Sequence, residues 1–297
     1  MSENLVTLYA KQYASNIELL AQRMSVLQDT VTVGAHNGDK ASPVDQVGSL
    51  EMKQVTDRFA AITPQAAPTA RRWVVPTAWD CAQLVDKFDK LKMMKDPDSA
   101  LVQTAALAKA RKWDDLIINA FFSAAYTGAE GTATTAFTAG NVVGVAHGAA
   151  AATGLTVAKL RKAKQLAIAN HYNPQFEQLY CVINSIQHDN LLAEAQVTSL
   201  DFNDKPVLVD GLVTRFLGIN FKICEGLQTG TDDAAGTSRA VPVYTKGGMH
   251  LGKWDDPEPD VSQRKDLKLH PWQIYQQMIG GATRTDETKV FKIWCRE

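Results

Sequence analysis

The stretch from Asp96 to Ala125 constrains the fold more than any other, because it predicts one long amphipathic helix. Asp96 can cap its start, Pro97 suits its first turn, and Asp98 places negative charge beside the positive end of the helix dipole. Its apolar residues recur at steps of three and four: Leu101, Val102, Ala105, Ala106, Trp113, Leu116, Ile117, Ala120 and Phe121. At about 1.5 Å per residue, the helix would be roughly 40 Å long and could span a domain.

The composition is that of a water-soluble globular protein. The chain has 297 residues, of which 45% are hydrophobic and 21% charged, so it could form one large domain or two modest ones. A formal net charge of -1 gives no general attraction to nucleic acid or to an anionic membrane. Residues 131–158 lack Asp, Glu, Lys and Arg, but they are mostly Ala, Gly and Thr and are too polar for a membrane span. The first residues do not form a secretory signal.

Cysteines and histidines do not form a metal-binding pattern in the sequence. The four cysteines are far apart, and we interpret them as buried thiols in a reducing compartment: Cys81, Cys181, Cys224 and Cys295. Five histidines are also isolated along the chain, and we expect ordinary hydrogen bonds from each: His36, His147, His171, His250 and His270. The sequence therefore predicts no metal ligands.

Sequence motifs of catalysis are absent as well. The chain contains no phosphate-binding loop, dinucleotide fingerprint, nucleophile elbow or HExxH motif. Asp114 and Asp115 would point about 100° apart on a helix, so we expect them to form surface or interhelix ion pairs rather than an acid/base dyad. We therefore predict no catalytic residue and no cofactor-binding residue.

Two weaker groupings have ordinary explanations. Ser185, His188 and Asp189 resemble the members of a hydrolase triad, but residues so close on one helical turn cannot lie in line. The acidic run WDDPEPD, residues 254–260, lacks the glycine and the distant glutamate of a calcium-binding loop. We interpret this run as a proline-stiffened surface loop.

The N-terminal segment predicts a second amphipathic helix, over residues 4–30. Its apolar residues again recur at steps of three or four: Leu5, Tyr9, Tyr13, Ile17, Leu20, Met24 and Leu27. Terminal segments are ordered only when something holds them. We expect this helix to pack either on its own domain or on a neighbouring subunit.

Residues 31–80 predict a long β-hairpin rather than a helix, because glycines and prolines interrupt them throughout. The runs SLEMKQVTDRF (49–59) and TARRWVVPTAW (69–79) favour strands, the first by its alternation of apolar with charged residues and the second by its β-favouring residues. An isolated two-stranded sheet is marginal in water. We therefore expect the hairpin to lie across another chain.

The remainder predicts an α+β fold. We expect a helix over residues 155–170, capped by Thr153 or Thr156, then a buried strand over 178–183 and a helix from Ile186 to Ala195. Residues 207–224 favour strands broken at Gly211 and Gly218, and residues 240–252 favour a hairpin that turns at Gly247 and Gly248. Two strands end the chain, the last alternating Phe291, Ile293 and Cys295 with Lys292 and Trp294.

This order of elements resembles the major capsid protein of tailed bacteriophages, whose fold is shared with encapsulins and the herpesvirus capsid floor. The most specific similarity is the run from Trp79 to Phe122, with its Asp-Pro-x-Ser helix start and Asp-containing long helix. LTVAKLRKAKQLAIAN (155–170) and DGLVTRFLGINFKIC (210–224) are similar to the next helix and the glycine-marked strand of that family.

The resemblance implies a domain organisation and a function. It implies an N-terminal arm (1–30), an extended loop (31–80), a peripheral domain (81–177 and 249–297) with the spine helix 96–125, and an axial domain (178–248). It implies a structural protein, not an enzyme, that assembles into hexamers and pentamers of an icosahedral shell around double-stranded DNA. The hairpin charges Glu51 and Lys53 would face Arg71 and Arg72. The candidate inter-subunit contacts are Tyr9, Tyr13, Leu50, Glu51, Met52, Lys53, Arg71, Arg72 and Trp73.

The resemblance also implies partners and leaves alternatives. We expect an unprocessed chain with a separate scaffolding protein, a portal, a decoration protein and non-specific contact with packaged DNA, without a cofactor or a membrane. The location would be the virion, after assembly in the host cytoplasm. The alternatives are an encapsulin-like compartment shell and, in another class, a soluble α/β hydrolase or ligand-binding domain. The run from Trp79 to Phe122 argues against the first alternative, and a stable monomer with a deep polar pocket would indicate the second.

Overall fold

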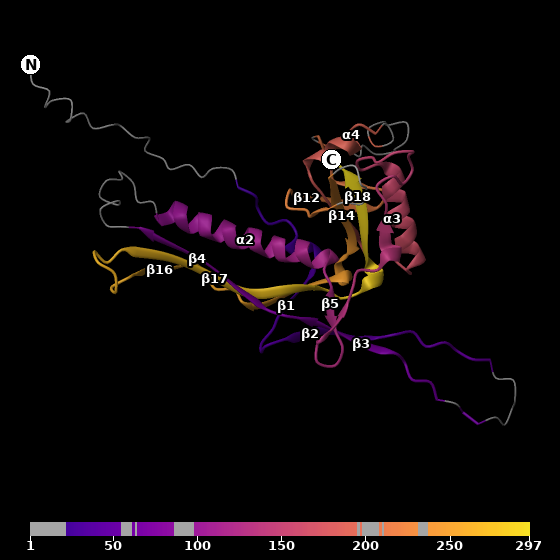
Figure 1. The fold of residues 1–297 in the computed structure, drawn as a ribbon, viewed down its shortest axis with the longest axis horizontal. Helices are drawn as coiled ribbons and strands as arrows, with labels where there is room; N and C mark the ends of the chain where they lie inside the picture. The colour runs from indigo at the N-terminus through magenta and orange to yellow at the C-terminus, as the bar shows by residue number, and fades with distance from the viewer. Residues whose placement is uncertain are drawn as a thin grey trace, which may run out of the picture. The chain divides into compact units, whose positions relative to one another are not determined.

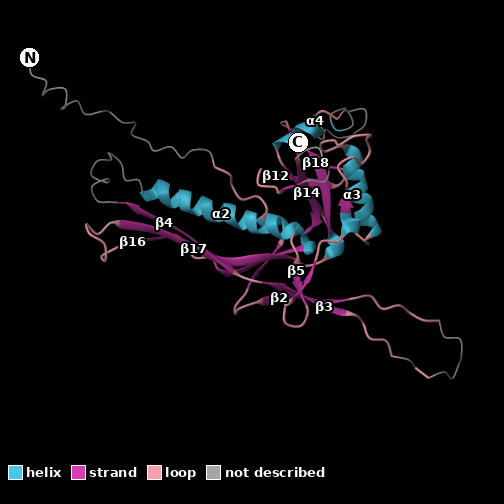
Figure 2. Cartoon of the chain, viewed as in Figure 1, coloured by secondary structure: helices cyan, strands magenta, loops and turns pink. Residues whose placement is uncertain are grey.

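The computed structural model describes residues 22–54, 61–62, 64–85, 98–194, 197, 208–209, 211–230 and 237–297 (Figures 1 and 2). For 42–44, 98–100 and 208–209 it describes the backbone alone. The chain forms two compact units. Unit one holds residues 1–24, 78–112 and 255–278, and unit two holds residues 25–77, 113–254 and 279–297. Helix α2 (Asp98–Phe122) and strands β4 (Thr77–Val85) and β17 (Trp272–Arg284) have residues in both units.

Unit one is a helix packed on a small sheet. Strand β17 pairs with β4 and, antiparallel, with β16 (Asp260–Gln263), and β4 and β17 run side by side next to α2 (Figure 1). Its core joins Val85, Ala105 and Ile274, with Leu101 and Val102 packed against them. Leu101, Val102 and Ala105 belong to the apolar stripe predicted for α2, and they pack against Val85 of β4 and Ile274 of β17.

Unit two contains a seven-stranded mixed sheet of order β11-β12-β8-β14-β18-β7, in which β13 also pairs with β14. Helices α3 and α4 belong to the same unit. The bounds are β7 Val142–Val143, α3 Val157–Ala169, β8 Leu179–Ile183, α4 Ser185–Leu192, β11 Arg215–Phe216, β12 Ile219–Ile223, β13 Thr229–Gly230, β14 Ser238–Thr245 and β18 Val290–Arg296. The central strands β8 and β14 are almost continuously buried, as strands covered on both faces should be.

Smaller elements complete the described chain. They are the 3-10 turns η2 Gln28–Thr30, η3 Ala139–Asn141, η5 Lys246–Gly248 and η6 Glu287–Lys289, and the strands β1 Thr32–Ala35, β2 Ala41–Val47, β3 Thr69–Val74, β5 Ala125–Thr127, β6 Ala133–Thr135, β9 Leu208–Val209, β10 Leu212–Val213 and β15 Met249–Asp255. Of the helices in the described part of the chain, none combines the length and the apolar character needed to span a bilayer.

The three predicted helices after residue 95 are present, with shorter ends. Helix α2 stops at Phe122 rather than Ala125, because β5 begins there, and the predicted caps Asp96 and Pro97 lie outside the described residues. The Thr156 side chain accepts a hydrogen bond from the Lys159 amide and is the cap of α3. Helix α4 begins with a capping box at Asn184, which our prediction did not include, and ends before the predicted Ala195, which is also outside the described residues.

The long-helix residue Trp113 is buried as its spacing predicts, with only 2% of its surface exposed. Strand β17 can pass against its indole ring because residue 280 is glycine. A Cβ atom at Gly280 would lie 2.4 Å from the Trp113 ring. The predicted strand breaks at Gly211 and Gly218 are confirmed too, since both glycines have a φ of 76°, which other residues rarely adopt.

The N-terminal helix prediction is wrong over the residues that the structure describes. Residues 22–27 are not helical, and only η2 follows them. The Asp114 carboxylate accepts hydrogen bonds from the Ser25 hydroxyl at 2.7 Å and from the amides of Val26 and Leu27 at 3.0 and 3.3 Å. These amides would otherwise be the donors of a helical turn, so a distant carboxylate replaces the helix.

Asp114 is not on the surface, which was one of the two positions that we expected for it, because its side chain is fully buried. We expect Asp114→Ala to lower the free energy of unfolding of the unassembled subunit by about 1 to 3 kcal/mol, since it leaves buried amides without an acceptor. Trypsin should also cleave after Arg23 faster than in the wild-type chain. Denaturant unfolding and a timed digest would measure the two effects. Unchanged cleavage would show that Asp114 does not hold this segment.

Strands β14 and β15 form where we predict them, but they do not form a hairpin. Strand β14 lies between β8 and β18 in the seven-stranded sheet, and β15 pairs in parallel with β1 in another sheet. Because both edges of β14 are already hydrogen-bonded, no edge remains for β15. The turn η5 is held by Thr285, whose amide and hydroxyl donate to the carbonyls of Gly248 and Gly247.

The cysteine prediction is correct for three of the four thiols. None of the four forms a disulfide; Cys181, Cys224 and Cys295 are buried, whereas Cys81 is exposed on β4. The alternation predicted for the last strand is confirmed, because Phe291, Ile293 and Cys295 are buried on β18 while Lys292 and Trp294 are partly exposed. Cys81 shares this exposure with every other residue of β4 except Val85.

Candidate interaction surfaces

The predicted hairpin exists, but its strands lie elsewhere. Strands β2 and β3 pair antiparallel from Ala41↔Val74 to Val47↔Thr69, and the Gly48 amide donates to the Pro68 carbonyl at 2.7 Å. Residues 49–54 are described without secondary structure, so the predicted strand 49–59 is wrong over that part, and residues 55–59 lie outside the described residues. The predicted strand 69–79 is divided between β3 and β4, since Pro76 has no amide hydrogen to continue a ladder.

The register also corrects the predicted facing of charges. Asp45 lies opposite Arg71, and Val44 lies opposite Arg72, so Glu51 and Lys53 face neither arginine. Arg71 donates to both Asp45 carboxylate oxygens, at 2.6 and 2.9 Å. Both side chains are largely exposed, so this pair contributes little to stability.

Trp73 and Arg72 are held inside unit two. Strand β3 also pairs with β5, which pairs with β6, and the Trp73 indole donates to the Gly128 carbonyl at 2.7 Å. Arg72 is only 8% exposed and lies 3.6 Å from the Glu287 carboxylate. These two contact candidates therefore have partners within unit two at the base of the hairpin.

Glu287 lies between two arginines at that base. Its carboxylate accepts from Arg284 Nε at 2.5 Å and lies 3.6 Å from Arg72. Arg284 is fully buried and also donates to the carbonyls of Phe121 at 2.8 Å and Ser123 at 2.9 Å. The Gln46 amide adds a hydrogen bond to the Thr285 carbonyl. The hairpin thus begins from a base with several buried bonds.

Beyond this base the hairpin is apolar and uncovered. Figure 1 shows residues 47–54 extending away from the rest of unit two. Large hydrophobic side chains there are exposed: Val47 70%, Leu50 59%, Met52 101% and Ile62 95%. Glu51 and Lys53 are exposed beside them. The candidates Tyr9 and Tyr13 lie outside the described residues. No described part of the chain covers Met52 or Ile62.

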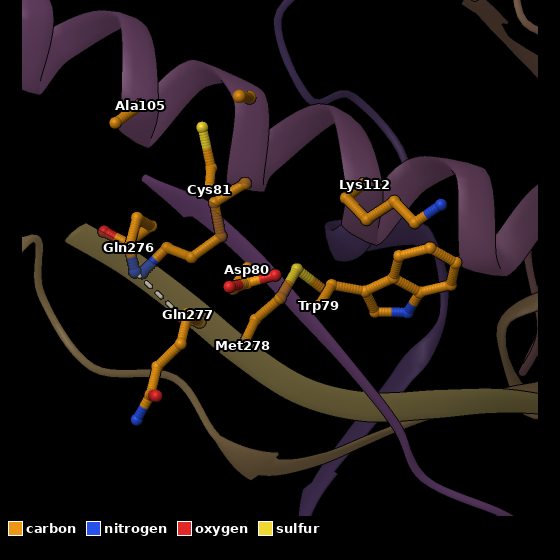
Figure 3. A pocket seen from close by; sticks show the side chains of 10 residues that line it. Trp79, Asp80, Cys81, Ala105, Lys112, Gln276, Gln277 and Met278 are labelled. Carbon is orange, nitrogen blue, oxygen red and sulfur yellow. Dashed lines mark hydrogen bonds between the residues drawn. The ribbon is translucent and has the colours of Figure 1, made fainter. Parts of the chain in front are cut away.

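A second surface lies in unit one along β4. Every residue from Thr77 to Leu84 is exposed, although β4 is hydrogen-bonded to β17. A pocket of about 180 Å³ lies between α2 and the strands β4 and β17 (Figure 3). Figure 3 shows the Cys81 side chain pointing toward α2 and the Lys112 side chain beside the Trp79 ring, with the ammonium 3.4 Å from the ring centroid. The pocket is lined by Trp79, Asp80, Cys81, Ala105, Ala108, Lys109, Lys112, Gln276, Gln277 and Met278.

The weaker chemical groupings are not assembled into sites. His188 Nε2 accepts from the Val213 amide at 3.3 Å, so its ring faces a backbone group. Asp256 forms an ion pair with Lys109 at 2.9 Å. Within the described ranges, no group of three His, Cys, Asp or Glu side chains is placed to hold a metal ion.

Two histidines that are isolated in the sequence are hydrogen-bonded to each other in the structure, as the expectation of ordinary hydrogen bonds allows. His36 Nε2 and His250 Nε2 are 2.8 Å apart. The Thr32 hydroxyl donates to the Met249 carbonyl at 2.7 Å, so it must accept from His250 Nδ1 at 3.0 Å. His250 Nε2 is then the acceptor and His36 Nε2 the donor. The pair joins the end of β1 to β15.

Acid should weaken unit two through this pair. Burial and the neighbouring His36 lower the pKa of His250 to about 4, from an ordinary value of 6.5, and burial also lowers the pKa of His36. The unfolded chain therefore binds a proton at His250 below pH 6.5, whereas the folded chain does not until about pH 4. The free energy of unfolding of the unassembled subunit should fall as pH drops across this window. His250→Gln should flatten that slope in denaturant titrations, and an unchanged slope would contradict the assignment.

Comparisons with known proteins define the fold. The family model described as phage capsid protein matches residues 5–297. The capsid of cyanophage P-SCSP1u has a TM-score of 0.76 at 17% identity, covering 99% of this chain and 96% of that one. The capsid of cyanophage Pam1 has a TM-score of 0.76 at 12% identity, covering 98% and 97%. The capsid of Ralstonia phage GP4 has a TM-score of 0.70 at 10% identity, covering 97% and 95%. No curated protein sequence matches the chain. The predicted α+β fold is confirmed.

Proposed function

This chain belongs to the phage capsid protein family, and from that premise we propose that it is the major capsid protein of a tailed-phage-type virion. It self-assembles into hexamers and pentamers of an icosahedral shell that encloses double-stranded DNA. Its role is structural. The observation that carries the proposal is the hairpin, which is braced at its base by buried ion pairs and exposes apolar side chains beyond it. Exposed apolar surfaces of this kind mark sites of protein–protein interaction.

The hairpin tip supplies the contact residues of this proposal. Leu50, Glu51, Met52 and Lys53 are exposed and are the contacts that we retain on the described chain. Arg71 is exposed at the edge of the base, and Tyr9 and Tyr13 extend the proposal to the N-terminal arm. Arg72 and Trp73 contribute indirectly, because they hold the hairpin to unit two. Closed symmetric shells repeat each such contact in every copy.

The regional roles are part of the same proposal. Residues 31–80 act as the extended loop, residues 1–30 as the arm, and residues 178–248 as the axial domain that meets its copies around the fivefold and sixfold axes. The peripheral domain comprises residues 81–177 and 249–297, and α2 is its spine. These roles have other boundaries than the two compact units, because α2, β4 and β17 have residues in both units.

The proposed partners follow from the role of a shell. They are further copies of this chain, a scaffolding protein, a portal, a decoration protein and packaged DNA. A net charge of -1 supports DNA contact that is non-specific and weak, because a strongly basic lining would bind the phosphates and oppose release. The site of action is the virion.

The size and content of particles test the proposal. Sedimentation and negative-stain images of the purified protein should give closed megadalton shells, formed alone or with the scaffolding protein. Nuclease-resistant DNA inside virion-derived particles would distinguish a capsid from an encapsulin-like compartment, which would hold a protein cargo. A chain that stays monomeric at high concentration with and without its scaffolding partner would contradict the proposal.

A further inference from the structure

The hairpin tip contains a segment with the sequence pattern of a strand but without a strand partner. In residues 49–54, Leu50 and Met52 alternate with Glu51 and Lys53, which gives one apolar and one charged face when extended. The structure describes this segment without secondary structure, and the β2–β3 ladder ends at Val47↔Thr69, with one more hydrogen bond at Gly48. The backbone polar groups of this segment are therefore unused by the described chain.

Strand β4 also lacks a described strand partner on one of its two edges. Among the strands that the structure describes, β17 alone pairs with β4, so the other edge of Asp80–Leu84 has no described neighbour. This edge also lacks the usual protection, because TAWDCAQLV contains no proline or lysine and only one charge, Asp80. A long uncovered edge of this kind is a template for the addition of a strand.

The faces of the two segments match in chemistry. Cys81 and Val85 of β4 face α2, where Val85 packs on Ala105 and where the pocket of Figure 3 has apolar walls at Ala108 and Met278. Asp80 lies on the alternate face. A strand added beside β4 with Leu50 and Met52 toward the α2 face would extend the apolar surface. Its other face would bring Lys53 to the side of Asp80.

We propose that residues 49–54 of one copy add as a β-strand to the free edge of β4 of a second copy, with Leu50 and Met52 on the face of Cys81. This inference rests on the proposed shell function and deepens it, because it states which backbone edge receives the hairpin and which face turns inward. The added strand would satisfy the free amides and carbonyls of both segments. It also explains why a segment with a strand-like sequence has no secondary structure in a single chain.

Cysteine crosslinking tests the proposed strand, because Cys81 is the exposed native thiol and Cys181, Cys224 and Cys295 are buried. Neighbouring strands lie about 4.7–4.9 Å apart, within the Cα separation that a disulfide spans. Leu50→Cys and Met52→Cys would each be assembled and oxidised with copper phenanthroline. At least one of them should give crosslinked pairs of chains on a non-reducing gel. The pairs should vanish when Cys81→Ser is added.

Glu51→Cys is the matched control, since it lies between the two test positions and projects from the opposite face. It should give several times less crosslinked product. Equal crosslinking of Glu51→Cys and Met52→Cys, or none from Leu50→Cys and Met52→Cys in intact particles, would overturn the strand proposal and leave the shell function standing. Failure of the wild-type chain to form any particle would instead contradict the shell function.

A measurement on the wild-type chain covers the case in which the cysteine variants do not assemble. Amide hydrogen exchange at Asp80–Leu84 should be slower in particles than in unassembled subunits. In the proposed pairing, every second amide of β4 would donate a hydrogen bond to the added strand and would be protected. Exchange that is equally fast in both states would overturn the proposal.

Discussion

Arg284→Met should lower the free energy of unfolding of the unassembled subunit by about 3 to 5 kcal/mol, the cost of removing one partner from a buried charge pair. Arg284 is fully buried and is bonded to Glu287 and to the carbonyls of Phe121 and Ser123. Methionine fills a similar volume without a donor. Among the described residues, the variant leaves Glu287 with one cation, Arg72, 3.6 Å away, and it leaves the carbonyls of Phe121 and Ser123, at the C-terminal end of α2, without theirs.

The matched control is Arg264→Met. Arg264 also forms a bidentate pair, with Asp266, but both side chains are exposed, and solvent screens such pairs. Denaturant unfolding of both variants should show a lower midpoint for Arg284→Met and no measurable change for Arg264→Met. Equal effects of the two substitutions would show that the buried arginine does not support the fold as we describe.

The parts of the fold that could be predicted depend on local periodicity. The long helix, the Thr156 cap of α3 and the alternation along β18 each follow from residues near one another in the sequence. Burial of Trp113 was also predictable from its place on the apolar stripe. These features required no knowledge of the tertiary structure.

The errors arise where a distant residue replaces a local partner. Asp114 holds amides that are 87 and 88 positions away and thereby removes the expected helix at residues 25–27. His36 and His250 are 214 positions apart, so their pairing has no sequence signal. Lys159, for which the sequence analysis made no prediction, is fully buried and donates to the carbonyls of Thr153, Gly154 and Trp294. In each case at least one partner comes from a distant part of the sequence and is brought close only by the tertiary structure.

The candidate contact surface was predictable in part for the same reason. Leu50 and Met52 alternate with charges, so an exposed ribbon could be inferred before any fold was known, and both are exposed. Arg72 and Trp73 were predicted as contacts too, but their partners Glu287 and Gly128 come from remote segments of the chain. The sequence analysis also did not predict the exposed edge of β4. That edge exists because, among the described strands, β4 pairs with β17 alone, and the order of strands in a sheet cannot be read from the sequence of one strand.

Replacing residues 49–67 with Asn-Gly should abolish shell formation without unfolding the subunit. The Gly48 amide already bonds to the Pro68 carbonyl, so a two-residue turn can close the shortened hairpin there. The removed tip packs on no other described residue at Met52 or Ile62, and therefore adds little to subunit stability. Burying Leu50, Met52 and Ile62 between copies would contribute about 1.5 to 3 kcal/mol each, and every copy in the shell would lose that contribution. Sedimentation and denaturant unfolding measure the two properties separately.

Two variants that keep the full length of the hairpin test whether its apolar side chains, rather than its length, are needed for assembly. Leu50→Gln, Met52→Gln and Ile62→Gln together should prevent assembly, whereas Glu51→Gln with Lys53→Gln should still give shells, because exposed charges contribute little to association. The unfolding midpoint should stay close to that of the wild-type chain in both. If the chain with the shortened hairpin assembled normally, the tip would not be the contact between copies. If the triple variant unfolded at much lower denaturant, the apolar tip would belong to the core of its own subunit, since only a side chain that is buried in the monomer can stabilise it.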